Sequence, residues 1–300
     1  MFFSRFMPRR ASIKRLILFM GAVVLPYRLS FAILRWRAAR GVDDPAANKA
    51  FAMACAHGQA SDRAAFCRRF VLYRLVDELD QALISFRGWG WHRRWVRTQG
   101  PQPPTHGPLL AITFHYGAGM HAVRALGCHE QGISIIHAPP EAAVTLGDTV
   151  GLWLARLRRV ALRRLSGAEG IVIGHAATQS LARLAAGGAI LALADVPHFG
   201  QQRTVSVPFC GDRVGLTTGL ARLAIRAQAP VYVFSCALAD DSPHRLLRIH
   251  GPLPITDPVA LTQEIGHLFE ATVQADPAAW HYWNIMSEAF PPPCSSLQAA

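Results

Sequence analysis

The sequence has few lysines and few acidic residues, and its cysteines show no paired spacing. Lys14 and Lys49 are the only lysines among 300 residues, so arginine carries almost all of the formal net charge of +12. Arginine suits phosphate and carboxylate ligands, because its planar guanidinium donates two parallel hydrogen bonds. The charge balance therefore predicts an acidic partner: phospholipid headgroups, nucleic acid or an acidic carrier protein.

Several familiar chemical motifs are also missing. The six cysteines include no C-x-x-C pair, which indicates free thiols in a reducing compartment. No G-x-S-x-G, G-x-x-x-x-G-K-[ST] or G-x-G-x-x-G occurs, which argues against a serine hydrolase and against nucleotide-fuelled chemistry. His115, His121 and His129 lack metal-ligand spacing, and no acid or cysteine completes a site. The arginines are too dispersed, and the chain too apolar, for a nucleic-acid-binding protein.

The N-terminus combines basic and apolar residues. LILFMGAVVLPYRLSFAIL occupies residues 16–34, with arginines on both sides. This pattern predicts a membrane anchor over residues 1–40 that lies at, or dips into, an anionic cytoplasmic leaflet. Pro26 and Arg28 interrupt the stretch, so it is an imperfect span. The alternative is a buried first helix of a soluble domain.

The remainder divides at the turn-rich residues 99–108. Apolar residues recur at helical spacing between 45 and 86, which predicts a helical region over 41–100. Beyond it, short apolar runs alternate with helical stretches, which predicts an α/β domain over 101–290. Its mixed, partly parallel central sheet is expected to be flanked by helices, with the site at the strand ends. The expected strands are 109–114, 133–138, 171–176, 189–195, 231–238 and 246–253, and the expected helices are 120–127, 150–165, 177–186, 217–228 and 258–275.

His115 is the first candidate for chemistry. It follows the apolar run LLAIT within TFHYGAGM, where a buried strand is expected to meet a helix. Strand ends are where α/β proteins place ligands. Gly117 and Gly119 allow a sharp turn or a close approach to a substrate. A histidine in such a place is often only structural, so its wider context must decide.

The order of motifs along the chain resembles the lysophospholipid acyltransferase superfamily, and within it the bacterial lipid A late acyltransferases, the lauroyl and myristoyl transferases. That branch has a strand leading into H-x-x-x-x-[D/E], here LLAITFHYGAGM. Further matches are LARLAAGGAILALADVPHFG (181–200), PFCGDRVGLTTGLARLA (208–224), Ala229-Pro230-Val231 and DPAAWHYW (276–283). The resemblance covers nearly the whole chain.

The resemblance implies an acyltransferase that moves a fatty acyl chain from acyl-ACP or acyl-CoA to a hydroxyl or amine of a lipid or lipid-like acceptor. The thioester is a co-substrate, and no cofactor is expected. The implied place is the cytoplasmic face of the inner membrane, with a membrane lipid as acceptor and no nucleic acid as partner. An alcohol is a poor nucleophile until a base removes its proton, which is a suitable role for neutral imidazole.

Position 120 departs from the family pattern, because Met120 stands where the acid of H-x-x-x-x-[D/E] is expected. A thioether neither stabilises an imidazolium nor fixes a tautomer. Three interpretations of the missing acid remain open. Another acid takes its role, or His115 acts without an acid, or the chain is a catalytically divergent protein that binds a lipid or an acyl carrier. The candidate acids are Asp195, Glu141 and Glu130. Asp195 is favoured, because it ends a strand near the same sheet edge.

His115 and Asp195 are thus the predicted catalytic pair. The predicted substrate-binding residues are Tyr116, Gly117, Gly119, Met120, His198, Arg203, Arg213, Thr217 and Thr218. His198, Arg203 and Arg213 have side chains suited to phosphate, and Thr217 and Thr218 precede a helix whose N-terminal N–H groups favour anions. Capping, or a place on the solvated surface, explains each of these residues equally well. Five arginines between 156 and 164 are candidates for docking the carrier protein or lipid headgroups.

Overall fold

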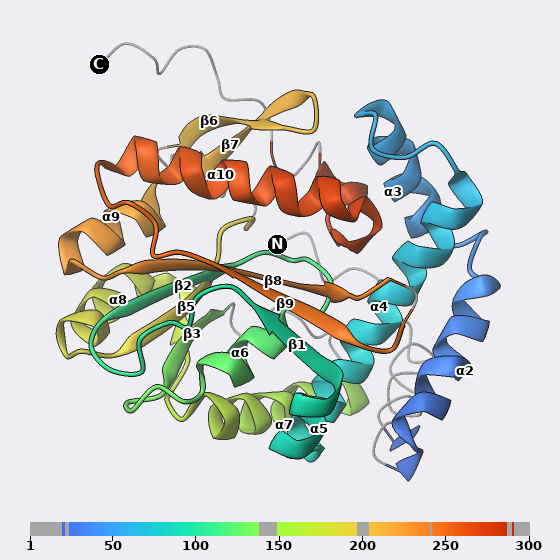
Figure 1. Ribbon diagram of the computed structural model, residues 1–300, viewed down its shortest axis with the longest axis horizontal. Coiled ribbons are helices and arrows are strands. Elements are labelled where there is room, and N and C mark those ends of the chain that lie inside the picture. The colour runs from blue at the N-terminus through green and yellow to red at the C-terminus, as the bar shows by residue number, and fades with distance from the viewer. Residues whose placement is uncertain are drawn as a thin grey trace.

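The computed structural model describes residues 20–21, 24–137, 149–196, 204–240, 242–286 and 290. A seven-stranded sheet runs through its centre, with helices above and below it (Figure 1). The strand order is β1-β9-β8-β2-β5-β3-β4, and all neighbours are parallel except β8 and β9. This confirms the expected mixed α/β sheet.

Six of the strands fall where short apolar runs predicted them. The sheet consists of β1 (Val96–Gln99), β2 (Leu109–Thr113), β3 (Ile133–His137), β4 (Ile171–Val172), β5 (Ala189–Leu193), β8 (Val231–Leu238) and β9 (Arg245–His250). The expected strand over 171–176 is shorter, because only the two residues of the edge strand β4 pair with β3, and a 3₁₀ turn (Ile173–His175) follows. β1, which pairs with β9, was not predicted from the sequence.

A separate antiparallel hairpin was also not predicted. β6 (Thr204–Phe209) pairs with β7 (Asp212–Thr217) around Cys210 and Gly211, both of which have positive φ. The helix expected over 217–228 therefore starts later, as α9 (Gly219–Ala227). The hairpin packs against the last long helix, α10 (Pro258–Ala275).

The two faces of the sheet can be followed along β2. Leu110 and Ile112 point into the main core, on the side of α10, whereas Leu109 and Ala111 point into a second core on the side of α6 (Met120–Leu126). All four are fully buried. This period-two alternation, with both faces covered by helices, explains why the strand reads as an unbroken apolar run.

Helices precede the sheet and line one side of it (Figure 1). These are α2 (Tyr27–Ala39), α3 (Pro45–Ala56), α4 (Arg63–Phe86) and α5 (Trp89–Trp95). The later α7 (Thr149–Ser166) packs against α6, and α8 (Ala176–Ala185) packs against α9. Asp44 and Asp62 cap α3 and α4 by accepting hydrogen bonds from Ala47 N and Ala65 N at 3.0 Å.

The predicted anchor helix is not supported. Its second half forms α2, which buries Tyr27, Phe31, Leu34 and Ala38 and packs against α4. Residues 1–19, 22 and 23 lie outside the described residues. Within the described part of the chain, no helix is long and apolar enough to cross a membrane.

A buried group of charged and polar side chains joins α4, α6 and β9. Arg245 donates to both carboxylate oxygens of Asp80, from Nε at 3.0 Å and from Nη2, and His121 Nε2 lies 3.1 Å from Asp80 Oδ2. All three side chains are fully buried. Burial lowers the pKa of His121 to about 3, so its ring is neutral near pH 7. Asp80 thus ties the helical layer to the sheet.

Candidate active site

His115 and Asp195 meet because two neighbouring strands end at the same level. β2 and β5 are parallel, and Thr113 is paired with Leu193 at their carboxyl ends. His115 and Asp195 each follow two residues later, beyond the last sheet pair. The register alone therefore places them side by side at the carboxyl edge of the sheet, where α/β proteins build their sites.

The contact between the two residues is specific. His115 Nδ1 lies 2.9 Å from Asp195 Oδ1, and the backbone N–H of His115 donates to both carboxylate oxygens, at 3.0 and 2.8 Å. An ionised carboxylate only accepts hydrogen bonds, so the proton on the ring belongs on Nδ1. Nε2 then keeps its lone pair, and no hydrogen bond to Nε2 is found within the described residues. The His115 side chain is 29% exposed while that of Asp195 is 0% exposed. The imidazole of His115 is therefore partly exposed to solvent, whereas the carboxylate of Asp195 is buried.

A third element completes the arrangement: the C-terminal segment, defined here as residues 276–286. Trp280 Nε1 donates to Asp195 Oδ2 at 3.0 Å. The ring of Tyr282 stacks on that of His115, with centroids 4.2 Å apart and planes 26° apart. The backbone N–H of His281 donates to His115 O at 2.9 Å. The segment therefore holds both members of the pair.

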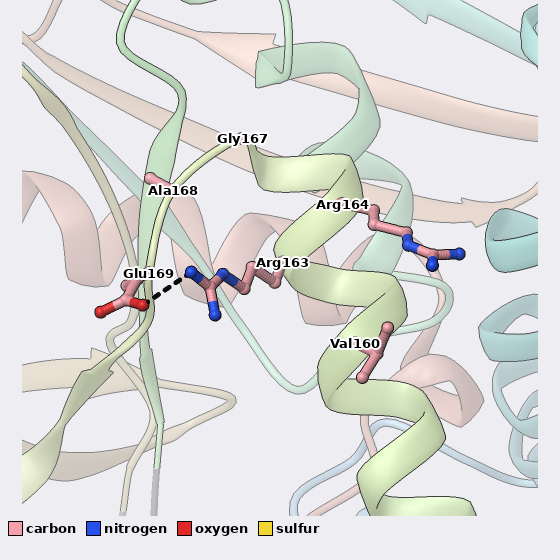
Figure 2. A pocket seen from close by; sticks show the side chains of 6 residues that line it. All are labelled: Val160, Arg163, Arg164, Gly167, Ala168 and Glu169. Carbon is pink, nitrogen blue, oxygen red and sulfur yellow. Dashed lines mark ion pairs between the residues drawn. The ribbon is translucent and has the colours of Figure 1, made fainter.

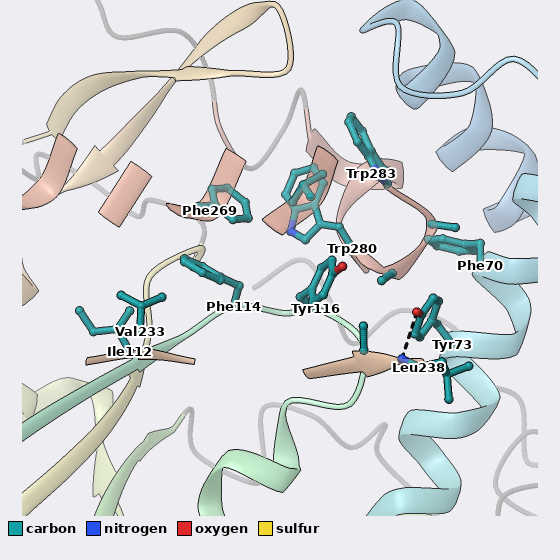
Figure 3. Close-up of a cluster of buried hydrophobic side chains, with 14 of the residues drawn as sticks. Phe70, Tyr73, Ile112, Phe114, Tyr116, Val233, Leu238, Phe269, Trp280 and Trp283 are labelled. Atoms are coloured by element: carbon teal, nitrogen blue, oxygen red, sulfur yellow. Dashed lines mark hydrogen bonds between the residues drawn. The ribbon is translucent and has the colours of Figure 1, made fainter. Parts of the chain in front are cut away.

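The C-terminal segment is itself fixed by α4. Arg69 donates to both carboxylate oxygens of Asp276, and the Tyr73 hydroxyl donates to the same carboxylate. Tyr73 also accepts a hydrogen bond from Leu238 N, at the end of β8. Figure 3 shows that bond and the neighbouring buried cluster, in which Trp280 lies with Phe114, Phe269 and Trp283. Helix α4 thus holds the C-terminal segment in place beside His115 and Asp195.

Gly117 is required by the local geometry. Its φ is +56°, and a Cβ there would lie 2.1 Å from the carbonyl oxygen of Cys236 in β8. This close approach lets Ala118 N donate to that oxygen at 2.8 Å, while Gly117 N donates to Ala279 O, also at 2.8 Å. Glycine therefore joins the turn after His115 to β8 and to the C-terminal segment.

One comparison with known proteins identifies the family of the chain. The family model described as "Bacterial lipid A biosynthesis acyltransferase" matches residues 135–284, half of the chain. The chain belongs to the bacterial lipid A biosynthesis acyltransferase family. Asp195, Trp280 and Tyr282 lie inside the matched range, and His115 precedes it. No curated protein matches the sequence significantly. Membership supports an acyltransferase of lipid biosynthesis.

The structure separates this acyltransferase's other predicted site residues into groups. Tyr116 is only 2% exposed and packs in the main core (Figure 3), which departs from the expectation that it contacts substrate. Successive residues of an extended chain face opposite ways, so Tyr116 points inward where His115 points outward. Gly119 precedes α6, and an added Cβ would make only ordinary contacts there. Met120 is half-buried and packs against the second core.

The residues after β5 that were expected to bind phosphate are described only in part. His198 and Arg203, like the alternative acid Glu141, lie outside the described residues. Arg213 donates to Ser206 Oγ at 2.7 Å and to Ser206 O at 2.9 Å, across the hairpin. Thr217 ends β7 and Thr218 precedes α9, with no side-chain cap. Glu130 is exposed, and its backbone N–H donates to Thr105 O.

A hollow at the end of α7 does not belong to this site. It has a volume of about 590 Å³, lies at the C-terminal end of α7 and is lined by Val160, Arg163, Arg164, Gly167, Ala168 and Glu169. Figure 2 shows the ion pair between Arg163 and Glu169 across it, at 2.9 Å. The hollow is open and contains neither residue of the acid–base pair.

Trp280 and Tyr282 are the functional residues that the sequence analysis missed. Both lie in DPAAWHYW, which was recognised as a motif but given no role. A buried indole N–H must find an acceptor, and the tryptophans of this motif were the only available signal.

Removing the Tyr282 ring tests its positioning role. Tyr282→Ala is expected to lower kcat about two- to tenfold, because an aromatic contact of this kind contributes about 0.5–1.5 kcal/mol to holding the imidazole plane. Tyr282→Phe keeps the ring and is expected to retain wild-type kcat. Steady-state acyl transfer by the two variants is the measurement. Equal losses in both would assign the effect to the hydroxyl instead.

Proposed function

We propose that the protein transfers a fatty acyl chain from acyl-ACP or acyl-CoA to a hydroxyl or amine of a lipid or lipid-like acceptor. The observation that carries the proposal is the 2.9 Å contact between His115 Nδ1 and Asp195, with Nε2 left for a substrate proton. Family membership supports the reaction class. The motif order favours the branch of late acyltransferases.

In the proposed reaction, His115 Nε2 removes the proton of the acceptor O–H or N–H as its oxygen or nitrogen attacks the thioester carbonyl carbon. Asp195 stabilises the imidazolium and keeps the ring oriented. The tetrahedral intermediate collapses, the C–S bond breaks, and the thiolate takes the proton from Nε2. The new ester or amide and the free thiol are released, and no cofactor is consumed.

The partners follow from charge. Acyl carrier proteins are acidic, and α7 exposes four arginines on one helix: Arg156, Arg159, Arg163 and Arg164. We assign α7 as the carrier-docking helix and the cytoplasmic face of the inner membrane as the place of reaction. The rival is a catalytically divergent protein that binds the acyl carrier or the lipid without transfer, and the substitution at Met120 is the observation in its favour.

Purified protein, incubated with radiolabelled acyl-ACP or acyl-CoA and a bacterial membrane lipid extract, tests the proposal. The expected result is a labelled lipid, resolved by thin-layer chromatography, that does not form with heat-denatured protein. If the protein retains labelled acyl-ACP on a sizing column but no lipid becomes labelled, the rival is correct. The mobility of the product identifies the acceptor class.

A further inference from the structure

The ring of His281, in the C-terminal segment, makes a hydrogen bond to the turn that follows His115. Its Nε2 lies 3.0 Å from the carbonyl oxygen of Gly117. A carbonyl oxygen only accepts hydrogen bonds, so the proton of this ring belongs on Nε2. Burial lowers the pKa of His281, which keeps the ring neutral near pH 7. A second histidine side chain therefore donates to the backbone beside the predicted base.

The same turn is also paired with the C-terminal segment through its backbone. His281 N donates to His115 O at 2.9 Å, and Gly117 N donates to Ala279 O at 2.8 Å. These two hydrogen bonds flank Tyr116, whose side chain packs in the main core (Figure 3). The bond from the His281 ring is a third one across this contact, and within the described chain no other side chain donates to Gly117 O.

Gly117 is the residue at which this turn can change shape. Its φ of +56° lies in the left-handed region, and glycine reaches negative φ values as readily as positive ones. The close approach to β8 requires glycine here, and so removes the steric restraint that a Cβ would supply. Rotation about the Gly117 dihedrals swings its carbonyl group, which the His281 ring holds. His115 lies two residues earlier in the same turn, so such a rotation would move its imidazole.

We propose that His281 is a positioning residue whose imidazole, by holding the carbonyl group of Gly117, keeps the ring of His115 in place. In this place His115 Nδ1 donates to Asp195 and Nε2 is left for the substrate. Other side chains of the C-terminal segment contact the acid and the base directly, whereas His281 acts on the backbone that carries the base. The kinetic consequence rests on the proposed acyl transfer, but the geometry of the His115 ring can be measured without any reaction.

Two substitutions of His281 separate its hydrogen bond from the bulk of its ring. His281→Met fills much of the same space but donates no hydrogen bond, whereas His281→Gln keeps an N–H donor at a similar reach. His281→Met is expected to lower kcat about two- to tenfold, the effect of one lost hydrogen bond. KM is expected to stay unchanged, because the ring positions the base and does not bind the substrate. His281→Gln is expected to retain the wild-type kcat in steady-state acyl transfer.

NMR of the ring nitrogens in isotope-labelled protein gives a measurement that needs no activity. In wild type, His115 is expected to show a protonated Nδ1 and an unprotonated Nε2, and its signals are assigned by their loss in His115→Ala. His281→Met is expected to populate the tautomer with the proton on Nε2, and His281→Gln to restore the wild-type signals. If wild type transfers no acyl group, the proposed function fails, and the NMR result alone decides the role of His281.

His129 supplies a matched control. Its Nε2 lies 2.9 Å from Gly107 O, which is the same kind of bond, but Gly107 precedes β2 at the opposite edge of the sheet. His129→Met is expected to leave kcat and the His115 signals unchanged. Unchanged kcat and unchanged His115 signals in His281→Met would overturn the proposal. So would equal losses of kcat in His281→Met and His129→Met, because general destabilisation would then explain both.

Discussion

Asp195→Asn is expected to lower kcat by about ten-thousandfold, the scale seen when a catalytic histidine loses its orienting acid. Asp195 accepts from three donors: the His115 backbone N–H, its Nδ1–H and Trp280 Nε1–H. An asparagine of the same shape has only one acceptor oxygen. Its NH₂ group must face either the indole N–H, which is a donor, or the imidazole. In the second case it stabilises the tautomer with the proton on Nε2, which cannot act as a base.

His115→Ala is expected to reduce activity by a similar factor, and the double variant to be no worse than the single ones, because the pair acts as a unit. Single-turnover transfer from labelled acyl-ACP is the measurement. Asp212→Asn, an exposed carboxylate in the hairpin, is the matched control and is expected to leave the rate unchanged. Full activity of Asp195→Asn would show that His115 works without this acid.

Asp80→Ala is expected to destabilise the fold by about 3–5 kcal/mol, because it leaves the guanidinium of Arg245 buried and unpaired. Burial already lowers the pKa of Arg245 to about 9, which shows how strongly this site disfavours a charge. His121 would lose its acceptor as well. Urea unfolding followed by circular dichroism gives the free energy of unfolding for each variant.

The control is the exposed ion pair at the end of α7. The side chains of Arg163 and Glu169 are 69% and 77% exposed, so Glu169→Ala is expected to stay within about 0.5 kcal/mol of wild type. Asp80→Leu combined with Arg245→Met is expected to recover most of the stability lost by Asp80→Ala, because apolar replacement of both partners removes the desolvation cost. A decrease in the free energy of unfolding of less than about 1 kcal/mol for Asp80→Ala, as for a surface ion pair, would contradict a structural role for the buried pair.

The sequence was most informative where local patterns decide structure. Apolar runs between turn residues located β2, β5 and β8, and Asp195 could be proposed as the acid because it ends such a run. The N-terminal prediction is not supported over α2, because it counted apolar residues without asking on which face they lie. Tyr27, Phe31, Leu34 and Ala38 have helical spacing, which already indicates one buried side.

Long-range contacts set the limit of prediction. Tyr282 and His115 are 167 positions apart, and neither residue's neighbours indicate that their rings stack. The hairpin of β6 and β7 was hidden because PFCGDRVGLTTG was interpreted as a motif rather than as two strands around a turn. The Asp80 cluster joins three distant segments, so only the folded chain shows that His121 has a structural partner.

The hydrogen bonds of Asp195 also concern the order of synthesis. The carboxylate ties the ends of β2 and β5 to an indole that is made 85 residues later. A chain still emerging from the ribosome has both strands long before it has Trp280 and Tyr282. The imidazole acquires its full set of contacts only after Tyr282 has been made, so a growing chain would remain inactive while its sheet is already forming.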